Sequence, residues 1–427
     1  SYLASGAIRG GSDRFDYSLA GLYSDTDGIH DFNSQWDRGE ISLRAGWDLT
    51  DSSSLSGGLL FTDSKQNFPT DDTGAVVDPN DFRESSQAVY SVGYENRLTD
   101  LYDFKLLCGY TEHDSTIYTV RDDIVDFFDG AFPSHYDRHF FDWQNNIRIA
   151  ENNRLAAGVT YERDATRTDE SSRRSIGVYV QDQVSWSDRT FLTAGFRYDD
   201  NDRYENFGTG NVDLAYLLTP NLKVRGSVGK GVRAPGFSEI FGFPGFGITG
   251  NPALEPETNV AVEGGVDYYA PGGRGYLLSS IYSNHFKNLI EFSFLVPPGS
   301  PNYTNIERAR SRGLEFEGSL NLTGGWWAGF NYTYANTKVT DAGSVPGGDF
   351  VLGDRLLRRP AHLGMLNTDY ISKRVRARVQ ALFKGERDDR RFFPDFSSER
   401  ITLPAYWTLD FNVSIPLFQF SQNRDGL

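Results

Sequence analysis

The sequence has no run of eighteen consecutive apolar residues, and only 38% of its 427 residues are hydrophobic. A transmembrane helix is therefore excluded, because it needs about 20 predominantly apolar residues to cross a bilayer. Cys108 is the only cysteine, so no intrachain disulfide and no multi-cysteine zinc site can form. Basic residues are also few, with 42 Lys and Arg against 58 Asp and Glu, and the net charge of -16 argues against nucleic acid as a partner.

What is present is a two-residue alternation of apolar and polar side chains. Between Trp407 and Ile415 the odd positions are apolar or aromatic and the even positions are polar. A strand with this pattern has one apolar face and one hydrated face. Aromatic residues make up 14% of the chain and concentrate near the ends of such stretches. The pattern predicts a transmembrane β-barrel, in which every backbone polar group is paired between strands.

Nine short turns rich in Gly, Pro, Asn and Asp alternate with nine longer polar loops. The short turns lie near residues 10–14, 50–52, 99–100, 151–152, 187–188, 219–220, 271–272, 323–324 and 372–374. The longer loops cover roughly 25–37, 65–85, 121–136, 164–173, 201–209, 233–256, 294–308, 340–360 and 387–404. This spacing predicts an all-β fold of about nineteen antiparallel strands, with the short turns on the periplasmic side.

Charged residues within the strands indicate which face lies inside the barrel. Glu315 and Glu317 alternate with leucine and phenylalanine, and Arg376 and Arg378 alternate with valine and alanine. A charged side chain that faces lipid costs about 2–4 kcal/mol near the bilayer midplane, so these positions are predicted to line a polar lumen. A barrel of this many strands is wide enough to need a plug.

A series of motifs is more specific than the alternation. In chain order the motifs are GVRAPGFSE (231–239), GNPALEPET (250–258), YSNHFKNLIEF (282–292), RGLEFEG (312–318) and LLRRPAH (356–362). The series resembles the barrel of TonB-dependent outer-membrane receptors, and the resemblance covers essentially the whole chain. The opening segment RFDYSLAGLYSDTDG (14–28) is most similar to the cobalamin-receptor branch of that family.

The resemblance implies a 22-stranded barrel with an N-terminal plug domain and a TonB box, neither of which lies in this sequence. Residues 1–427 are accordingly predicted to be a receptor β-barrel domain that lacks its plug, its first strand and its last two strands. The implied setting is a monomer in the outer membrane of a Gram-negative bacterium. Its partners are then membrane lipid, TonB through the missing N-terminal part, and an extracellular nutrient. The implied activity is TonB-energised uptake of a scarce bulky nutrient, such as cobalamin, a ferric siderophore or haem.

Two groups of residues are candidates for contact with the ligand or the plug. The aromatic, glycine-rich stretch in the 233–256 loop is predicted to bind substrate through Phe237, Phe241, Phe243 and Phe246. Arginines on the lumen wall are predicted to contact the plug, namely Arg225, Arg376 and Arg378.

An acidic loop is a candidate for calcium. Its hard oxygen donors at short spacing are Asp71, Asp72, Asp78 and Asp81. The spacing differs from that of an EF-hand, so a solvated acidic loop without a metal is the competing interpretation. No other cofactor is expected.

Other functions remain open at this level. A passive outer-membrane channel would conduct solutes without a ligand and would lack a plug. An outer-membrane hydrolase would need a catalytic cluster, yet the six histidines are spaced singly and no HExxH or GxSxG motif occurs. Only a cluster assembled across strands could supply one, so the chain is predicted not to be an enzyme. A soluble β-repeat protein is disfavoured, because the strand pairs vary in spacing.

Overall fold

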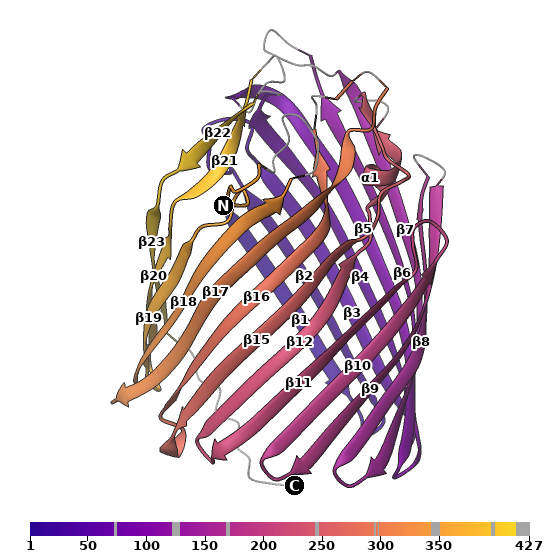
Figure 1. Cartoon of the computed structure of the whole chain (residues 1–427), viewed down its shortest axis with the longest axis vertical. Helices are drawn as coiled ribbons and strands as arrows, with labels where there is room; N and C mark the ends of the chain where they lie inside the picture. Colours follow the sequence, from indigo (N-terminus) through magenta and orange to yellow (C-terminus); the bar gives the residue numbers. More distant parts are fainter. Residues whose placement is uncertain are drawn as a thin grey trace.

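Nineteen antiparallel strands form one continuous sheet in the computed structural model, and each strand pairs with the next wall strand along the chain. The structure describes residues 1–71, 75–121, 129–167, 171–243, 247–293, 296–297, 299–342, 351–393 and 398–415. Figure 1 shows the sheet curved into a barrel wall of strongly tilted strands. The predicted strand number and the all-β class are confirmed.

The wall strands run in chain order from β1 to β23. They are β1 (Tyr2–Gly11), β2 (Phe15–Thr26), β3 (Trp36–Thr50), β4 (Ser53–Thr70), β5 (Val76–Thr99), β6 (Tyr102–Thr119), β7 (Gly130–Ala150), β8 (Asn153–Thr166), β9 (Ser171–Ser187), β10 (Thr190–Asn201), β11 (Phe207–Thr219), β12 (Leu222–Arg233), β15 (Glu257–Ala270), β16 (Gly275–Phe292), β17 (Tyr303–Thr323), β18 (Trp326–Asp341), β19 (His362–Ile371), β20 (Arg376–Lys384) and β23 (Tyr406–Ser414).

The connections alternate between short and long, as the sequence predicts. The nine short turns gather at the lower end of the barrel in Figure 1, each within two residues of its predicted position, and the long connections gather at the upper end. The long connections carry further elements: α1 (Phe237–Phe241), the pair β13 (Gly242–Phe243) and β14 (Ile248–Thr249), and the hairpin β21 (Arg387–Phe392) with β22 (Ser398–Leu403). The short turn from β15 to β16 contains the 3-10 turn η2 (Pro271–Gly273). In the described part of the chain, no helix is long and apolar enough to cross a membrane.

Several strands extend further than the sequence indicates. The segment 65–85 is predicted as a loop, but β4 continues to Thr70 and β5 begins at Val76. With 24 residues, β5 is far longer than the 9–11 residues that a tilted strand needs to span a bilayer. Beyond the bilayer neither face of a hairpin contacts lipid. The alternation that identifies a strand is therefore absent there.

The wall has an apolar outer face instead of a packed apolar core. Leu409 and Phe411 on β23 are 74% and 71% exposed, and they share a face with Val379 on β20. Buried apolar side chains in the described residues lie at the long-loop end, namely Ile240, Leu254, Ile306, Ala309, Val339 and Ala361. This arrangement confirms that alternate side chains meet two different surroundings, apolar outside and polar within.

Tyrosines cover glycines across neighbouring strands. Tyr179 on β9 lies directly opposite Gly158 on β8, and Tyr282 on β16 lies opposite Gly313 on β17. A methyl group on either glycine would come closer to the tyrosine ring than the 3.0 Å that real Cβ contacts keep. These positions therefore require glycine for the close approach of the ring.

Candidate functional site

Charged side chains on the lumen wall form interlocked pairs between adjacent strands. On β12, Arg225 pairs with Glu263 of β15, and its Nε lies 3.3 Å from Oδ1 of Asp267. Lys223 Nζ lies 2.8 Å from Oδ2 of the same Asp267, whose side chain is only 4% exposed. Arg225 thus lies in the lumen as predicted, but its charge is already engaged by the wall.

The two arginines of β20 differ from each other. Arg376 and Arg378 lie on the face opposite to Val379, so both point into the lumen. Arg378 Nε donates a hydrogen bond of 2.5 Å to Oδ1 of Asp369 on β19. Arg376 is exposed and makes no ion pair within the residues that the structure describes. Of the predicted plug-contacting arginines, Arg376 therefore has the charge most available to another molecule.

The lumen wall is hollowed where small residues interrupt it. One recess of about 630 Å³ opens over Gly195 and Gly229 and is bordered by Tyr179, Gln181 and Arg197. Its lining combines aromatic, cationic and amide groups, so it is suited to a ligand or protein surface with mixed polarity.

The connection from β12 to β15 is fastened at its base by one arginine. Arg233 donates to both oxygens of Glu257 at 2.7 and 2.8 Å and to both oxygens of Glu239 in α1 at 3.0 and 3.3 Å. The Glu239 carboxylate also accepts the backbone N–H of Gly236 at 2.6 Å, which caps α1. These bonds fix the direction in which the loop leaves the strand.

The same connection is held against the inner wall of β7–β9. Arg173 on β9 donates to the carbonyl of Pro235 at 2.8 Å, and its guanidinium lies 5.0 Å from the ring centroid of Phe237. Asp164 on β8, whose side chain is 4% exposed, accepts from Arg173 at 2.9 Å and from Arg138 at 2.7 Å. The loop therefore crosses from β12 to strands three to five positions away and narrows the upper lumen.

The aromatic residues predicted to bind substrate lie at this narrowed end. Phe237 and Phe241 stack with ring centroids 6.0 Å apart, and Phe237 also contacts Tyr136 edge to face. Phe243 is 44% exposed, whereas Phe246 lies outside the described residues. Phe237 is thus partly committed to anchoring the loop, and Phe243 is the more accessible surface.

Several motif residues of the sequence resemblance serve as loop anchors. Asn251 donates to the carbonyl of Tyr303 at 2.9 Å, and Asn305 donates to the carbonyl of Glu255 at 3.0 Å. Asn288 completes the network by donating to the Glu255 carboxylate at 2.6 Å. Their side chains replace backbone pairing where the β12–β15 loop crosses β16 and β17.

The β21–β22 hairpin is fastened to the β18–β19 connection. Arg358 Nε donates to Oδ1 of Asp389 at 2.8 Å, and Arg400 Nη2 donates to the carbonyl of Arg355 at 2.8 Å. Burial raises the pKa of Asp389, but hydrogen bonds from Arg358 and from the backbone N–H of Arg390 outweigh burial and hold this pKa below its ordinary value.

The acidic loop is more buried than a solvated loop would be. Asp71, Asp78 and Asp81 are 8%, 0% and 8% exposed, while Asp72 lies outside the described residues. Oδ1 of Asp78 accepts the backbone N–H groups of Asn80 and Asp81 at 2.8 and 2.9 Å. In the described part these carboxylates do not converge into a group of three metal ligands.

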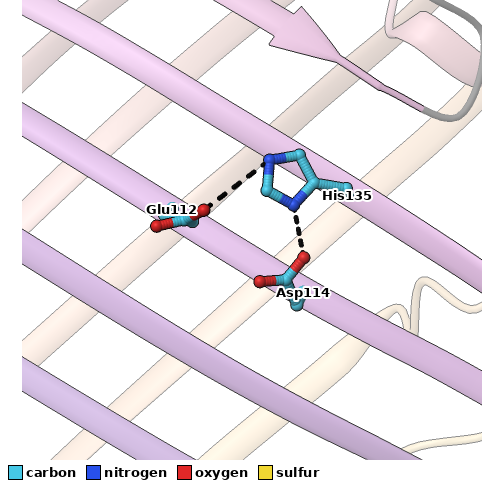
Figure 2. Close-up of side chains that lie close together, drawn as sticks. All are labelled: Glu112, Asp114 and His135. Atoms are coloured by element: carbon cyan, nitrogen blue, oxygen red, sulfur yellow. Dashed lines mark hydrogen bonds and ion pairs between the residues drawn. The ribbon is translucent and has the colours of Figure 1, made fainter.

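Sequence reasoning missed a different cluster, which Figure 2 shows between β6 and β7. His135 lies between Glu112 and Asp114, and one ligand atom from each of the three lies within 4.8 Å of the others. Histidine and carboxylates are 21 or more residues apart in sequence, so no local motif marks the site.

Comparisons with known proteins agree with this geometry. The family model of the TonB-dependent receptor-like β-barrel matches residues 5–423. The vitamin B12 transporter BtuB of Photobacterium profundum is 25% identical over 313 residues, which cover 69% of this chain and 48% of that protein. The iron-regulated outer membrane virulence protein of Vibrio cholerae is 26% identical over 281 residues, with 60% and 40% covered. The crystal structure of the siderophore receptor PirA from Acinetobacter baumannii has a TM-score of 0.82 at 16% identity, covering 97% of this chain and 71% of that chain.

An antiparallel barrel wall with an apolar outside, a charged lumen and long loops at one end defines a transmembrane β-barrel. Since the family match spans nearly the whole chain, the protein belongs to the TonB-dependent receptor β-barrel family. The chain spans about half or less of the length of the curated relatives it matches.

Proposed function

We propose that this chain forms the barrel wall of an outer-membrane receptor, without enzymatic activity, that takes up a scarce bulky nutrient with energy supplied through TonB. Family membership supports the receptor class. Relatives are named for vitamin B12 transport and for iron regulation, so cobalamin and ferric siderophores or haem are the ligand classes to test. The Gram-negative outer membrane is the corresponding location.

The observation that carries the proposal is the inward fold of the β12–β15 connection. Arg173 holds Pro235 and Phe237 against the inner wall, so this loop narrows the lumen mouth and presents Phe243 nearby. A receptor that must enclose a specific ligand needs such a surface.

The lumen wall supports a coupling role for its arginines. Arg376 presents an exposed cation to the lumen, whereas Arg225 and Arg378 are already paired with wall carboxylates. We assign Arg376 to direct contact with a plug. Arg225 and Arg378 would exchange their partners when the plug moves.

Uptake by the complete receptor tests the function. Cells that express it are given labelled cyanocobalamin, ferric siderophores or haem, with and without TonB. Saturable, TonB-dependent uptake of one of them is expected. Ligand-independent conductance in a planar bilayer, together with TonB-independent uptake, would instead identify a passive channel.

Charge reversal tests the coupling role separately. Arg376→Glu should lower uptake while ligand binding at the cell surface persists. Arg374→Glu, two residues away in the short turn, is the matched control and should leave uptake unchanged. Equal uptake by both variants would remove Arg376 from the coupling mechanism.

For the β4–β5 loop we propose a calcium ion near Asp78. This side chain is fully buried, and its Oδ2 has no hydrogen-bond partner within the described residues. Buried carboxylate oxygens without a donor are stabilised by a cation. Calcium titration of the complete receptor should give heat that Asp78→Asn loses and that Asp31→Asn, in the exposed β2–β3 loop, retains. Identical titrations for both variants would exclude this site.

A further inference from the structure

The outer wall of the barrel carries a compact group of titratable side chains between β6 and β7. Glu112 and Asp114 lie on β6, and the strand register places them directly opposite Asp137 and His135 on β7. They occupy the same alternate positions as Cys108 on β6, whose partner is the exposed Phe141. The group therefore points outward, away from the lumen and from the surfaces proposed for ligand and plug.

The group begins where the apolar band of the wall ends. Tyr110, one outward position below Glu112, stacks with Tyr90 at a centroid distance of 6.2 Å and packs against His139 at 4.8 Å. Aromatic girdles of this kind mark the interface between membrane and water. The carboxylates immediately above the girdle lie at the water edge, where an ion has direct access.

The imidazole of His135 is oriented as in metal sites. Its Nδ1 is hydrogen bonded to Oδ1 of Asp114 (Figure 2), and its Nε2 lies 3.9 Å from Glu112 Oε1 and 4.0 Å from Asp137 Oδ2. A carboxylate that accepts from Nδ1–H fixes the tautomer whose lone pair is on Nε2. The carboxylates of Glu112 and Asp137 are on the side where a metal would bind.

The separations suit an ion that bridges the groups better than they suit direct hydrogen bonds. Distances of 3.9 and 4.0 Å exceed a normal hydrogen bond. Ligands held about 2.0–2.1 Å from a tetrahedral zinc lie about 3.3 Å apart, so each of these two separations would shorten by about 0.6–0.7 Å on binding. Water would fill a remaining position.

Local charge and burial agree with a divalent cation. Within the residues that the structure describes, the three carboxylates form an ion pair with one guanidinium, that of Arg167 at 3.7 Å from Glu112, which leaves two negative charges when the histidines are neutral. The side chains of His135 and Asp137 are only 12% and 13% exposed. Partly buried negative charge of this amount is stabilised by a bound dication.

We propose that Glu112, His135 and Asp137, with Asp114 orienting the imidazole, bind a first-row divalent metal ion on the outer wall. The imidazole nitrogen favours Zn²⁺ over Ca²⁺ and Mg²⁺, which prefer oxygen ligands alone. The ion joins β6 to β7 where their long hairpin leaves the membrane. It is a structural clamp and is separate from any transported cargo.

Zinc titration of the complete, chelator-treated receptor in detergent tests the proposal, with X-ray absorption at the zinc edge as a second readout. The wild type should bind one zinc more than His135→Ala and show an imidazole signature that this variant lacks. His285→Ala is the matched control, because His285 lies on the outer wall beside Val260 and is hydrogen bonded to Ser283, with no carboxylate in an ion pair with it among the described residues. It should bind zinc like the wild type.

Two further variants keep the test decisive if His135→Ala fails to fold. Glu112→Gln preserves the size of the side chain and should abolish the difference in zinc binding. Asp114→Asn should weaken binding by about 10–100-fold, as expected for a residue that positions a ligand. Equal zinc binding by the wild type and the folded Glu112→Gln variant would overturn the proposal, as would displacement of zinc by an equal concentration of Ca²⁺. The first result would leave the cluster as an ion-pair group only, and the second would make it a cation site without preference for zinc.

Discussion

Replacing Arg233 by methionine should release the β12–β15 connection without unfolding the barrel. Arg233 makes the bonds that tie α1 to the start of β15, whereas the nineteen-stranded sheet pairs independently of it. Methionine retains much of the length of the side chain and removes only the guanidinium. The expected effect is therefore local opening of the loop over the lumen.

The magnitude follows from how buried the partners are. Glu239 and Glu257 have side chains 17% and 16% exposed, while Arg233 is 50% exposed. Removing one partner of a fully buried pair costs about 3–5 kcal/mol, and an exposed pair contributes about 0.2–1 kcal/mol. Each carboxylate also keeps one backbone donor, so we expect about 2 kcal/mol. That value corresponds to about a 30-fold larger open population.

Hydrogen exchange of the complete receptor measures this opening. Amides of residues 237–241 should exchange about 30-fold faster in Arg233→Met, while amides in the wall strands keep their rates. Arg391→Met is the control, because its pair with Glu399 is exposed on both sides at 60% and 49% and lies on a different loop. If residues 237–241 exchanged in Arg233→Met within threefold of the wild-type rate, the anchoring role of Arg233 would be wrong.

Two further predictions concern packing and pH. Gly158→Ala should force Tyr179 away and lower the free energy of unfolding in urea by about 1–3 kcal/mol. Gly39→Ala, which has open space at its Cβ position, should lower it by less. Equal urea midpoints for the two variants would contradict the packing of Tyr179 on Gly158. Because the pKa of Asp389 is lowered, its bond to Arg358 should stabilise the β21–β22 hairpin at pH above about 4, its ordinary value, and this stability should be lost as the pH falls through the lowered value. Amide hydrogen exchange in the hairpin, corrected for the intrinsic rate at each pH, should show this loss in the wild type and not in Asp389→Asn. Hairpin protection that does not change with pH in the wild type would refute the prediction.

The alternation of apolar and polar residues predicted the strands of the barrel wall, because each strand and each tight turn depends on the residues of its own segment. The segment around Phe411 alternates between two solvents, and each tight turn needs Gly, Pro, Asn or Asp at its own position. Strand number, turn positions and lumen polarity therefore follow from the sequence. The extension of β5 beyond the bilayer did not, since neither of its faces contacts lipid there and the alternation is lost.

The candidate sites were less predictable. Arg225 was placed correctly in the lumen, but its pairing with Glu263 and Asp267 depends on how β15 aligns with β12. The sequence predicts that Phe237 contacts the ligand, and only the folded loop shows that Arg173 lies against its ring at the wall.

The sequence by itself determined which side chains face lipid and which face water, because apolar and polar side chains alternate with a period of two residues within each strand separately. Tertiary structure decided which side chains meet. His135 and Glu112 become neighbours only through the register of β6 against β7, and Arg173 reaches Pro235 only because a loop folds across the lumen. Such contacts depend on the alignment of segments far apart in the chain, and no local pattern encodes that alignment.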